Sequence, residues 1–144
     1  MNIVINKCFG GFSISLECAK RMADLGDKRA TAEVNEWEQD NKYIKEFIET
    51  GKWNNSLDKD DIWNLSLDAK YLGEKKFYGY GYVDGFEGGY ERNNEILARV
   101  VKELGNLANG EHANLEVVEI PDDVDYYIDE YDGIESIHEN HRSW

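Results

Sequence analysis

A long helical periodicity in the first half of the chain sets the strongest limit on its fold. Mostly apolar side chains recur at intervals of three and four residues, the spacing of one face of an α-helix. That face consists of Ala30, Val34, Trp37, Asn41, Ile44 and Ile48. The residues between them are largely charged, so we expect them to face water. Gly51 stands where such a helix is expected to end.

Segments with strand character lie on both sides of this helix. Residues 2–9 are predicted to form an opening strand that ends at the Gly10-Gly11 pair. Residues 114–120, NLEVVEI, are predicted as a second strand. Apolar and acidic residues then alternate over 124–129, which predicts a further strand close by.

Two more helices are predicted from their ends. Ser13 and Ser15 are both candidate N-caps for a helix that ends near Gly26. Asn93 or Asn94 is expected to cap another helix, since an apolar stripe follows them. Side-chain oxygens of serine and asparagine accept hydrogen bonds from the first amides of a helix, which explains the preference.

Strands and helices are therefore interleaved without a repeat. The predicted fold class is α+β: a single compact domain over residues 1–144, with a small mixed or antiparallel sheet packed with three to four helices. Residues 52–74 show a weaker pattern and are predicted as a loop plus a short element, so the region of about 52–75 is treated as variable. After the turn at Asp132-Gly133 we expect a short terminal helix.

Residues 75–94 alternate aromatic rings with glycine. In an extended strand the tyrosines at 78, 80 and 82 point to one face and the glycines at 79 and 81 to the other. One interpretation is that glycine lets a neighbouring backbone or ring pack closely. The other is that the missing side chains make room for a flat ligand, against which Tyr78, Tyr80 or Phe77 would stack.

The segment 91–94, ERNN, lies at a predicted helix start, where free amides and the positive end of the helix dipole attract phosphate. Arg92 adds a forked, permanently charged donor, and Asn93 offers an amide for ribose or a base edge. The alternative is structural: an asparagine caps the helix and Arg92 pairs with one of the many carboxylates.

The charge balance limits the partners. Thirty acidic residues against 16 basic ones give a net charge of −14 at pH 7, and such a field repels a nucleic acid polymer. A small anionic ligand remains compatible, because salt screens distant charge within roughly 10 Å. No stretch approaches the length of a membrane span and the N-terminus lacks a signal peptide, so we expect no membrane partner and a cytoplasmic location.

Catalytic and metal-binding motifs were sought in the same way. Six carboxylates between residues 122 and 132 match no calcium-binding loop, and the three histidines form no HExxH motif. There is no nucleophile elbow and no phosphate-binding P-loop. Cys8 and Cys18 have no CxxC spacing and are expected to be buried free thiols. The sequence therefore predicts no catalytic residues, no metal site, no cofactor and no enzyme activity.

The segments NIVINKCFGGFSIS, ERNNEIL, VKELGNLANG, LEVVEIPDDVDYYIDEYDGIE and HRSW resemble a family of small proteins encoded by tailed bacteriophages and prophages. The match covers roughly 1–26 and 90–144. The family resembles the Thoeris anti-defence proteins, which sequester cyclic ADP-ribose-type signals without cleaving them, and some of which also bind the cyclic oligonucleotides of CBASS immunity. The resemblance implies that this chain acts in the cytoplasm of an infected host.

The resemblance also implies roles for single residues. An aromatic residue shortly before ERN would stack on adenine, which here points to Phe77 or its neighbours, and Arg92 with Asn93 would hold phosphate and ribose. The residue after NG is often basic in such proteins, but here it is Glu111, which removes one expected phosphate contact. Arg29 and Arg142 are further candidates on charge alone.

Two more expectations remain. Four tryptophans and nine tyrosines exceed what a small core must bury, so a homo-oligomer is expected, in agreement with the family resemblance. The rival to a nucleotide sponge is an acidic protein-interaction module, a mimic of DNA that occupies a host or defence protein, for which the charge of −14 is the motivating feature. An enzyme acting on nucleotides is the third class.

Overall fold

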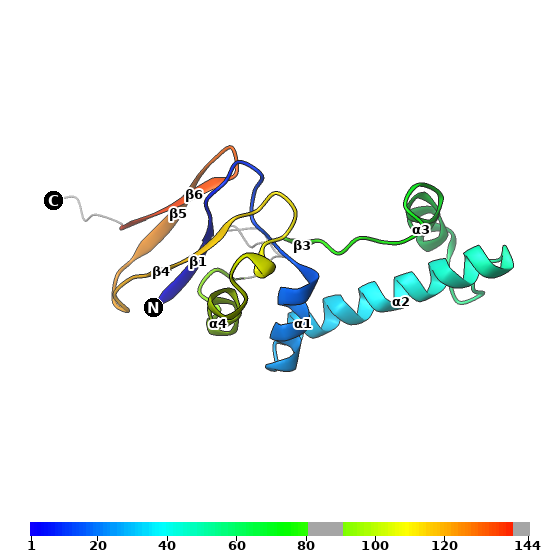
Figure 1. Ribbon diagram of the computed structural model, residues 1–144, viewed down its shortest axis with the longest axis horizontal. Helices are drawn as coiled ribbons and strands as arrows, with labels where there is room; N and C mark the ends of the chain where they lie inside the picture. The colour runs from blue at the N-terminus through cyan, green and yellow to red at the C-terminus, as the bar shows by residue number, and fades with distance from the viewer. Residues whose placement is uncertain (81–90, 140–144) are drawn as a thin grey trace. The chain divides into compact units, whose positions relative to one another are not determined.

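The computed structural model describes residues 1–80 and 91–139 (Figure 1). Its backbone divides into two compact units, one formed by Met1–Thr31 with Tyr78–Trp144 and the other by Ala32–Phe77. We call them the terminal unit and the inserted unit. Helices and antiparallel strand pairs make up the described residues, so the predicted α+β class is confirmed. The single domain expected over residues 1–144 stays a prediction.

The predicted first and second strands pair with each other in the terminal unit. Strand β1 (Asn2–Asn6) runs antiparallel to β4 (Leu115–Glu119), with Val4 opposite Val117. All of β1 from Ile3 onward is buried, which means that both faces of this strand are covered. The opposite edge of β1 is also engaged, because the Val4 amide donates to the Arg92 carbonyl at 2.8 Å.

The segment after Asp132-Gly133 is a strand, so the predicted terminal helix is wrong over the residues described. Strand β5 (Tyr126–Tyr131) forms an antiparallel hairpin with β6 (Ile134–Glu139). Asp132 and Gly133 both have positive φ, 52° and 92°, as a type I′ turn requires. Such a turn matches the twist of two strands, so the chain returns as a strand and does not enter a helix.

Two predicted helices complete the terminal unit. Helix α1 (Leu16–Asp24) begins at Ser15, whose side chain accepts from the Cys18 amide, while the rival cap Ser13 lies in strand β2 (Ser13–Ile14). Helix α4 (Glu95–Leu104) begins at Asn94 and continues into a 3-10 turn, η1 (Gly105–Ala108). The two helices and β1 form the core, whose fully buried members include Ile3, Ile5, Met22, Leu97 and Val100.

The tyrosine–glycine stretch contributes a short strand to the same unit. Strand β3 (Gly79–Tyr80) pairs antiparallel with β2, placing Gly79 opposite Ile14. The remaining part of the predicted extended segment, with Tyr82 and the Asp84-Gly85 turn, lies outside the described residues.

Helix α2 (Lys28–Thr50) confirms the long periodicity and its end, since Gly51 follows with a φ of 74° and donates to the Phe47 carbonyl. It begins in the terminal unit and continues through the inserted unit. There the Phe47 ring stacks on Trp53 with 4.1 Å between centroids. Asn41 and Trp37 both donate to the Lys75 carbonyl, which ties the far end of the unit to α2.

The region predicted as a loop with a short element contains a further helix, α3 (Lys59–Tyr71). Its start is a capping box: the Asp58 carboxylate accepts from the Asp61 amide at 2.8 Å, and the Asp61 carboxylate accepts from the Asp58 amide. The sequence signal was obscured because apolar residues occur on more than one side of this helix.

Candidate functional site

Two helix starts meet in the terminal unit, at α2 and α4. Asp27 precedes α2, and its carboxylate accepts from the Ala30 amide at 2.8 Å. Asn94 caps α4 by accepting from the amides of Ile96 and Leu97 at 2.9 and 3.1 Å. The Asn94 side-chain amide then donates to the second carboxylate oxygen of Asp27 at 2.9 Å. One hydrogen bond therefore joins the two caps.

Two of the predicted site residues lie next to these caps in the sequence. Arg29 is the second residue of α2, and Asn93 directly precedes the α4 cap. Arg29 is half-buried and Asn93 is exposed. The caps already accept from the amides of Ala30, Ile96 and Leu97, so an anion here would be favoured by the positive ends of the two helix dipoles and not by those amides. Sequence reasoning chose Arg29 on charge alone, with no signal that α2 starts beside ERNN.

Arg92, the main predicted phosphate ligand, has a different environment. Its side chain is buried, with 5% exposed, and its two terminal nitrogens both bond the carboxylate of Glu135, which is 3% exposed. The guanidinium carbon also lies 3.7 Å from the centroid of the Phe12 ring, a cation–π distance. The structural alternative is therefore observed, but with a buried carboxylate and not a surface one.

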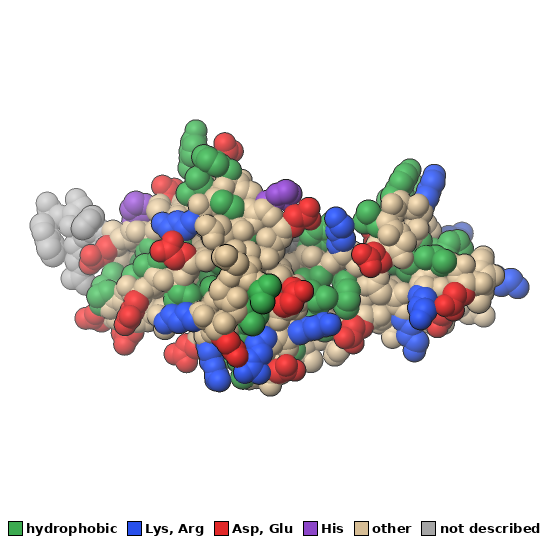
Figure 2. All heavy atoms as spheres, viewed as in Figure 1, with side chains coloured by type: hydrophobic (Ala, Val, Ile, Leu, Met, Phe, Trp, Pro, Cys, Tyr) green, Lys and Arg blue, Asp and Glu red, His purple; other side chains and the backbone are tan. Residues whose placement is uncertain are grey.

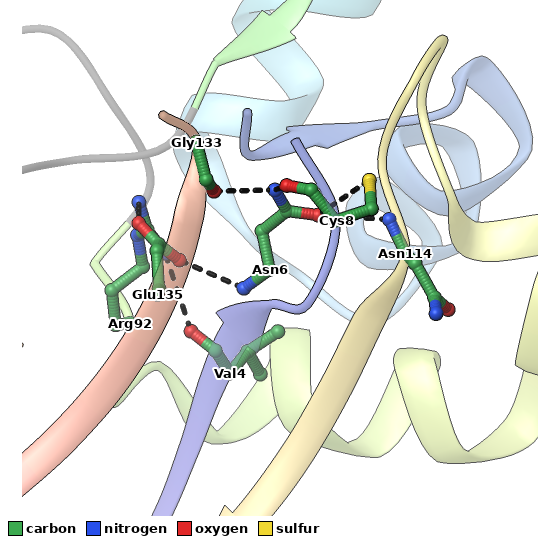
Figure 3. A network of polar contacts seen from close by, with 7 residues as sticks. All are labelled: Val4, Asn6, Cys8, Arg92, Asn114, Gly133 and Glu135. Atoms are coloured by element: carbon green, nitrogen blue, oxygen red, sulfur yellow. Dashed lines mark hydrogen bonds and ion pairs between the residues drawn. The ribbon is translucent and has the colours of Figure 1, made fainter. Parts of the chain in front are cut away.

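The ion pair belongs to a wider polar network that holds β1 to β6 (Figure 3). The Asn6 amide donates to Glu135 at 2.8 Å, and the Asn6 side chain donates to the carbonyls of Cys8 and Gly133 at 2.8 and 2.7 Å. Asn114 donates its backbone amide to the Asn6 side-chain oxygen at 2.8 Å. Every polar atom of the Asn6 side chain is thus used, as burial requires.

These residues come from the segments that carry the family resemblance. Asn6 lies in INKCFGG, Arg92 in ERN, and Gly133 with Glu135 in YDGIE. The structure therefore brings three of those segments into one buried network. Sequence reasoning missed Asn6 and Glu135, because a terminal helix was expected where Glu135 lies. The available signal was the Asp132-Gly133 turn, which predicts a hairpin and an inward-facing Glu135.

For Arg92, a ligand phosphate would have to displace Glu135 or share the guanidinium with it. Removing one partner of a buried ion pair leaves an uncompensated charge, so such a displacement is costly. We therefore assign Arg92 a positioning role between β1, β6 and the start of α4, and its contact with a ligand stays a prediction.

The predicted stacking rings are divided between the two units. Phe77 is half-buried and belongs to the inserted unit, whereas Tyr78, with 51% exposed, and Tyr80 in β3 belong to the terminal unit. Gly79 is buried and lies opposite Ile14 in the β2–β3 pair. Arg142 lies outside the described residues.

The loop after NG presents an acidic group where the predicted resemblance leads one to expect a basic residue. Glu111 is exposed and lies 3.5 Å from the exposed His112 ring. Gly110 before it is packed so closely that an added Cβ would meet the Ser13 hydroxyl at 2.1 Å. This turn is therefore built on contacts with the β2 segment and offers a carboxylate to solvent.

The cysteines are both free, as predicted, but they differ in burial. Cys18 is fully buried, and burial raises the pKa of its thiol to about 12. Cys8 is half-buried and donates to the His112 carbonyl at 2.7 Å. Within residues 1–80 and 91–139, no three His, Cys, Asp or Glu side chains are grouped so that they could hold a metal ion.

The surface in view carries acidic and basic side chains mixed with hydrophobic ones (Figure 2). Among the residues that the structure describes, no helix has both the length and the apolarity needed to cross a membrane. Comparisons with protein-family models, curated proteins and solved structures find no match for this chain.

Proposed function

We propose that this protein binds a small cyclic nucleotide signal, of the cyclic ADP-ribose or cyclic oligonucleotide type, and sequesters it without cleaving it. The observation that supports the proposal is the hydrogen bond between Asp27 and Asn94, which joins the starts of two helices. The positive dipole ends of the two helices lie at these starts, and such ends are suited to phosphate. In a host cell this activity would make the chain a phage anti-defence protein of the cytoplasm.

The proposal assigns its contacts to a smaller set of residues than the sequence predicted. Arg29 supplies the charge-assisted phosphate contact and Asn93 supplies amide contacts to ribose or phosphate, since Arg92 is committed to Glu135. Glu91 and Glu95 are exposed on either side, so the ligand is held by specific donors and not by a broad positive surface. Tyr78 offers an exposed ring for adenine in the same unit.

The test is calorimetric titration with cyclic ADP-ribose isomers and cyclic dinucleotides. A charge-assisted hydrogen bond contributes about 1.5–3 kcal/mol, so Arg29→Ala is expected to weaken binding by roughly tenfold or more. Arg99→Ala is the matched control, because Arg99 is an exposed arginine of α4 and its loss changes the net charge equally. Arg92→Ala is a poor probe, since it leaves Glu135 unpaired.

Two further results decide between sequestration and turnover. Heat denaturation of the complex is expected to release a ligand of unchanged mass, and a cleaved product would instead establish an enzyme. If none of these nucleotides binds at low or high salt, the sponge proposal fails.

A second candidate function is an acidic protein-interaction module, and the β5–β6 hairpin supports it. Tyr127, Asp129, Glu130 and Tyr131 of β5 are all exposed, whereas Tyr126 and Ile128 are half-buried. Aromatic rings between carboxylates suit a basic protein surface, through ring contacts and charge attraction. Capture of a partner that weakens steeply with salt, together with absence of nucleotide binding, would favour this function.

A further inference from the structure

Helix α3 of the inserted unit exposes a line of large apolar side chains. Trp63 is 68% exposed, Leu67 47% and Tyr71 70%. They are spaced by four residues, so they lie on one face of the helix. We call these three residues the α3 stripe. Figure 2 shows hydrophobic side chains at the surface in the region that α3 occupies in Figure 1.

The α3 stripe is not the face that α3 uses inside its own unit. Leu65 is buried, with 4% exposed, and Ile62 and Ala69 are half-buried. A helix at the surface of a domain needs one apolar side to pack against that domain. The second apolar side has a different use, and exposed apolar patches typically mark an interaction surface.

The helix is anchored at both ends, so the direction of the stripe is set by the fold. The capping box of Asp58 and Asp61 defines its start. Just before the start, Ser56 lies within hydrogen-bond distance of the Tyr43 hydroxyl of α2. Just beyond its end, the Lys75 amide donates to the Asn41 side chain of α2 at 2.8 Å.

We propose that the α3 stripe is an interface with the α3 helix of a second copy of this chain, paired antiparallel about a twofold axis at Leu67. A twofold axis requires a surface that is complementary to itself. Leu67 is equidistant in sequence from Trp63 and Tyr71, so the axis places Trp63 of each copy against Tyr71 of the other. Helices commonly pack through rows of residues spaced by four, and paired aromatic rings add to the stabilisation.

The charges around the stripe are also complementary to themselves. Residues 58–61 hold three aspartates and one lysine, a net charge of −2, and all four are exposed. Beyond the other end of the stripe, Lys75 is paired with Asp40 of its own unit, which leaves the exposed Lys70, Glu74 and Lys76 with a net charge of +1. Antiparallel pairing brings the negative start of each helix beside the positive end of the other. A parallel pair would place like charges together. The charge pattern therefore favours a second copy in the antiparallel arrangement.

The first test is the mass of the protein in solution at micromolar concentration. Light scattering and sedimentation are expected to show a dimer or an even multiple of the 16.6 kDa chain. Trp63→Ser is expected to raise the dissociation constant by at least about tenfold, as for a buried tryptophan at an interface. Tyr131→Ser is the control, since Tyr131 is 77% exposed on β5 in the other unit and its loss is expected to leave the mass unchanged.

The second test locates the axis and remains informative even if Trp63→Ser fails to fold. In a Cys8→Ser background, Leu67→Cys is expected to link two copies with a short thiol-specific crosslinker, because a residue on the axis meets its own counterpart. Lys45→Cys, on the exposed side of α2, is expected to stay unlinked.

Several outcomes would overturn the inference. A monomeric wild type refutes it directly, and protection of Trp63 in that monomer would mean that another part of the same chain covers the stripe. A dimer that neither Trp63→Ser weakens nor Leu67→Cys crosslinks would place the interface elsewhere.

Discussion

The two units of this protein use buried and exposed groups in opposite ways. In the terminal unit, Arg92 and Glu135 are both buried and each satisfies the other. In the inserted unit, Trp63 and Tyr71 of α3 are large apolar side chains that lie mostly in solvent. The terminal unit therefore buries a pair of charged groups that satisfy each other, whereas the inserted unit leaves apolar surface available to a partner.

The difference teaches how each unit is specified. Contacts in the terminal unit join residues far apart in the chain, such as Asn6 and Glu135. The contacts of the inserted unit are local by comparison, since Asp58 caps its own helix and Phe47 stacks on Trp53. We expect the destabilising effect of a substitution to spread through the whole terminal unit but to remain local in the inserted unit.

The largest effect is expected for Glu135→Ala. The change leaves the buried Arg92 charge without its partner, and such a loss typically costs about 3–5 kcal/mol of unfolding free energy. Urea denaturation measures it. Glu130→Ala is the control, since Glu130 is an exposed carboxylate on the same hairpin. A Glu135→Ala protein as stable as Glu130→Ala would contradict the importance of the buried network.

A double variant sharpens this prediction. Arg92→Met combined with Glu135→Leu removes both charges and keeps apolar volume, so it is expected to be more stable than Glu135→Ala alone. A double variant that is no more stable would show that the hydrogen bonds to Asn6 and Val4, and not the unpaired charge, account for the loss.

The next effect concerns pH and the core of the terminal unit. Burial raises the pKa of the Cys18 thiol to about 12 in the folded protein, against 9.0 for an exposed thiol. Between these values the unfolded state loses the proton and the folded state keeps it, so the unfolding free energy falls as pH rises above 9. The full slope is about 1.4 kcal/mol per pH unit. Cys18→Ala is expected to lack this component when stability is measured from pH 8 to 11, and equal slopes would contradict it.

The smallest effect is expected in the inserted unit. Asp58→Ala removes the N-cap of α3, which typically costs about 0.5–2 kcal/mol. Hydrogen exchange is expected to accelerate in the amides of α3 and to stay unchanged in α4. Asp60→Ala is the control, because Asp60 lies in the same first turn but is not the capping residue. Faster exchange throughout both units would contradict the claim that effects in the inserted unit stay local.

The sequence was most informative where a single segment decides the structure. Ser15 and Asn94 were each one of two predicted caps, and Gly51 was predicted as a helix end, because capping depends on neighbours in the chain. Helix α3 was missed although Asp58 and Asp61 form a capping box. Apolar residues on two sides removed the usual amphipathic pattern, since one side serves the unit and the other is exposed.

The candidate site was less predictable because its geometry depends on long-range contacts. Arg92 and Asn93 were chosen correctly as residues at a helix start, but no local pattern shows that Glu135 occupies the Arg92 guanidinium. The approach of Asp27 to Asn94 is likewise a contact between two helices. Both contacts depend on tertiary packing, which hydrophobic periodicity and composition do not reveal.

The pairing of Asn6 with Glu135 also has a consequence for protein synthesis. Strand β1 is translated early, but the carboxylate that its amide binds arrives 129 residues later. At about 5–20 residues per second, the ribosome needs roughly 6 to 26 seconds to supply it. During that interval an apolar strand has an unfilled edge, a condition that favours pairing with other chains. The inserted unit ends at Phe77, so all of its residues are synthesised well before Glu135 of the terminal unit.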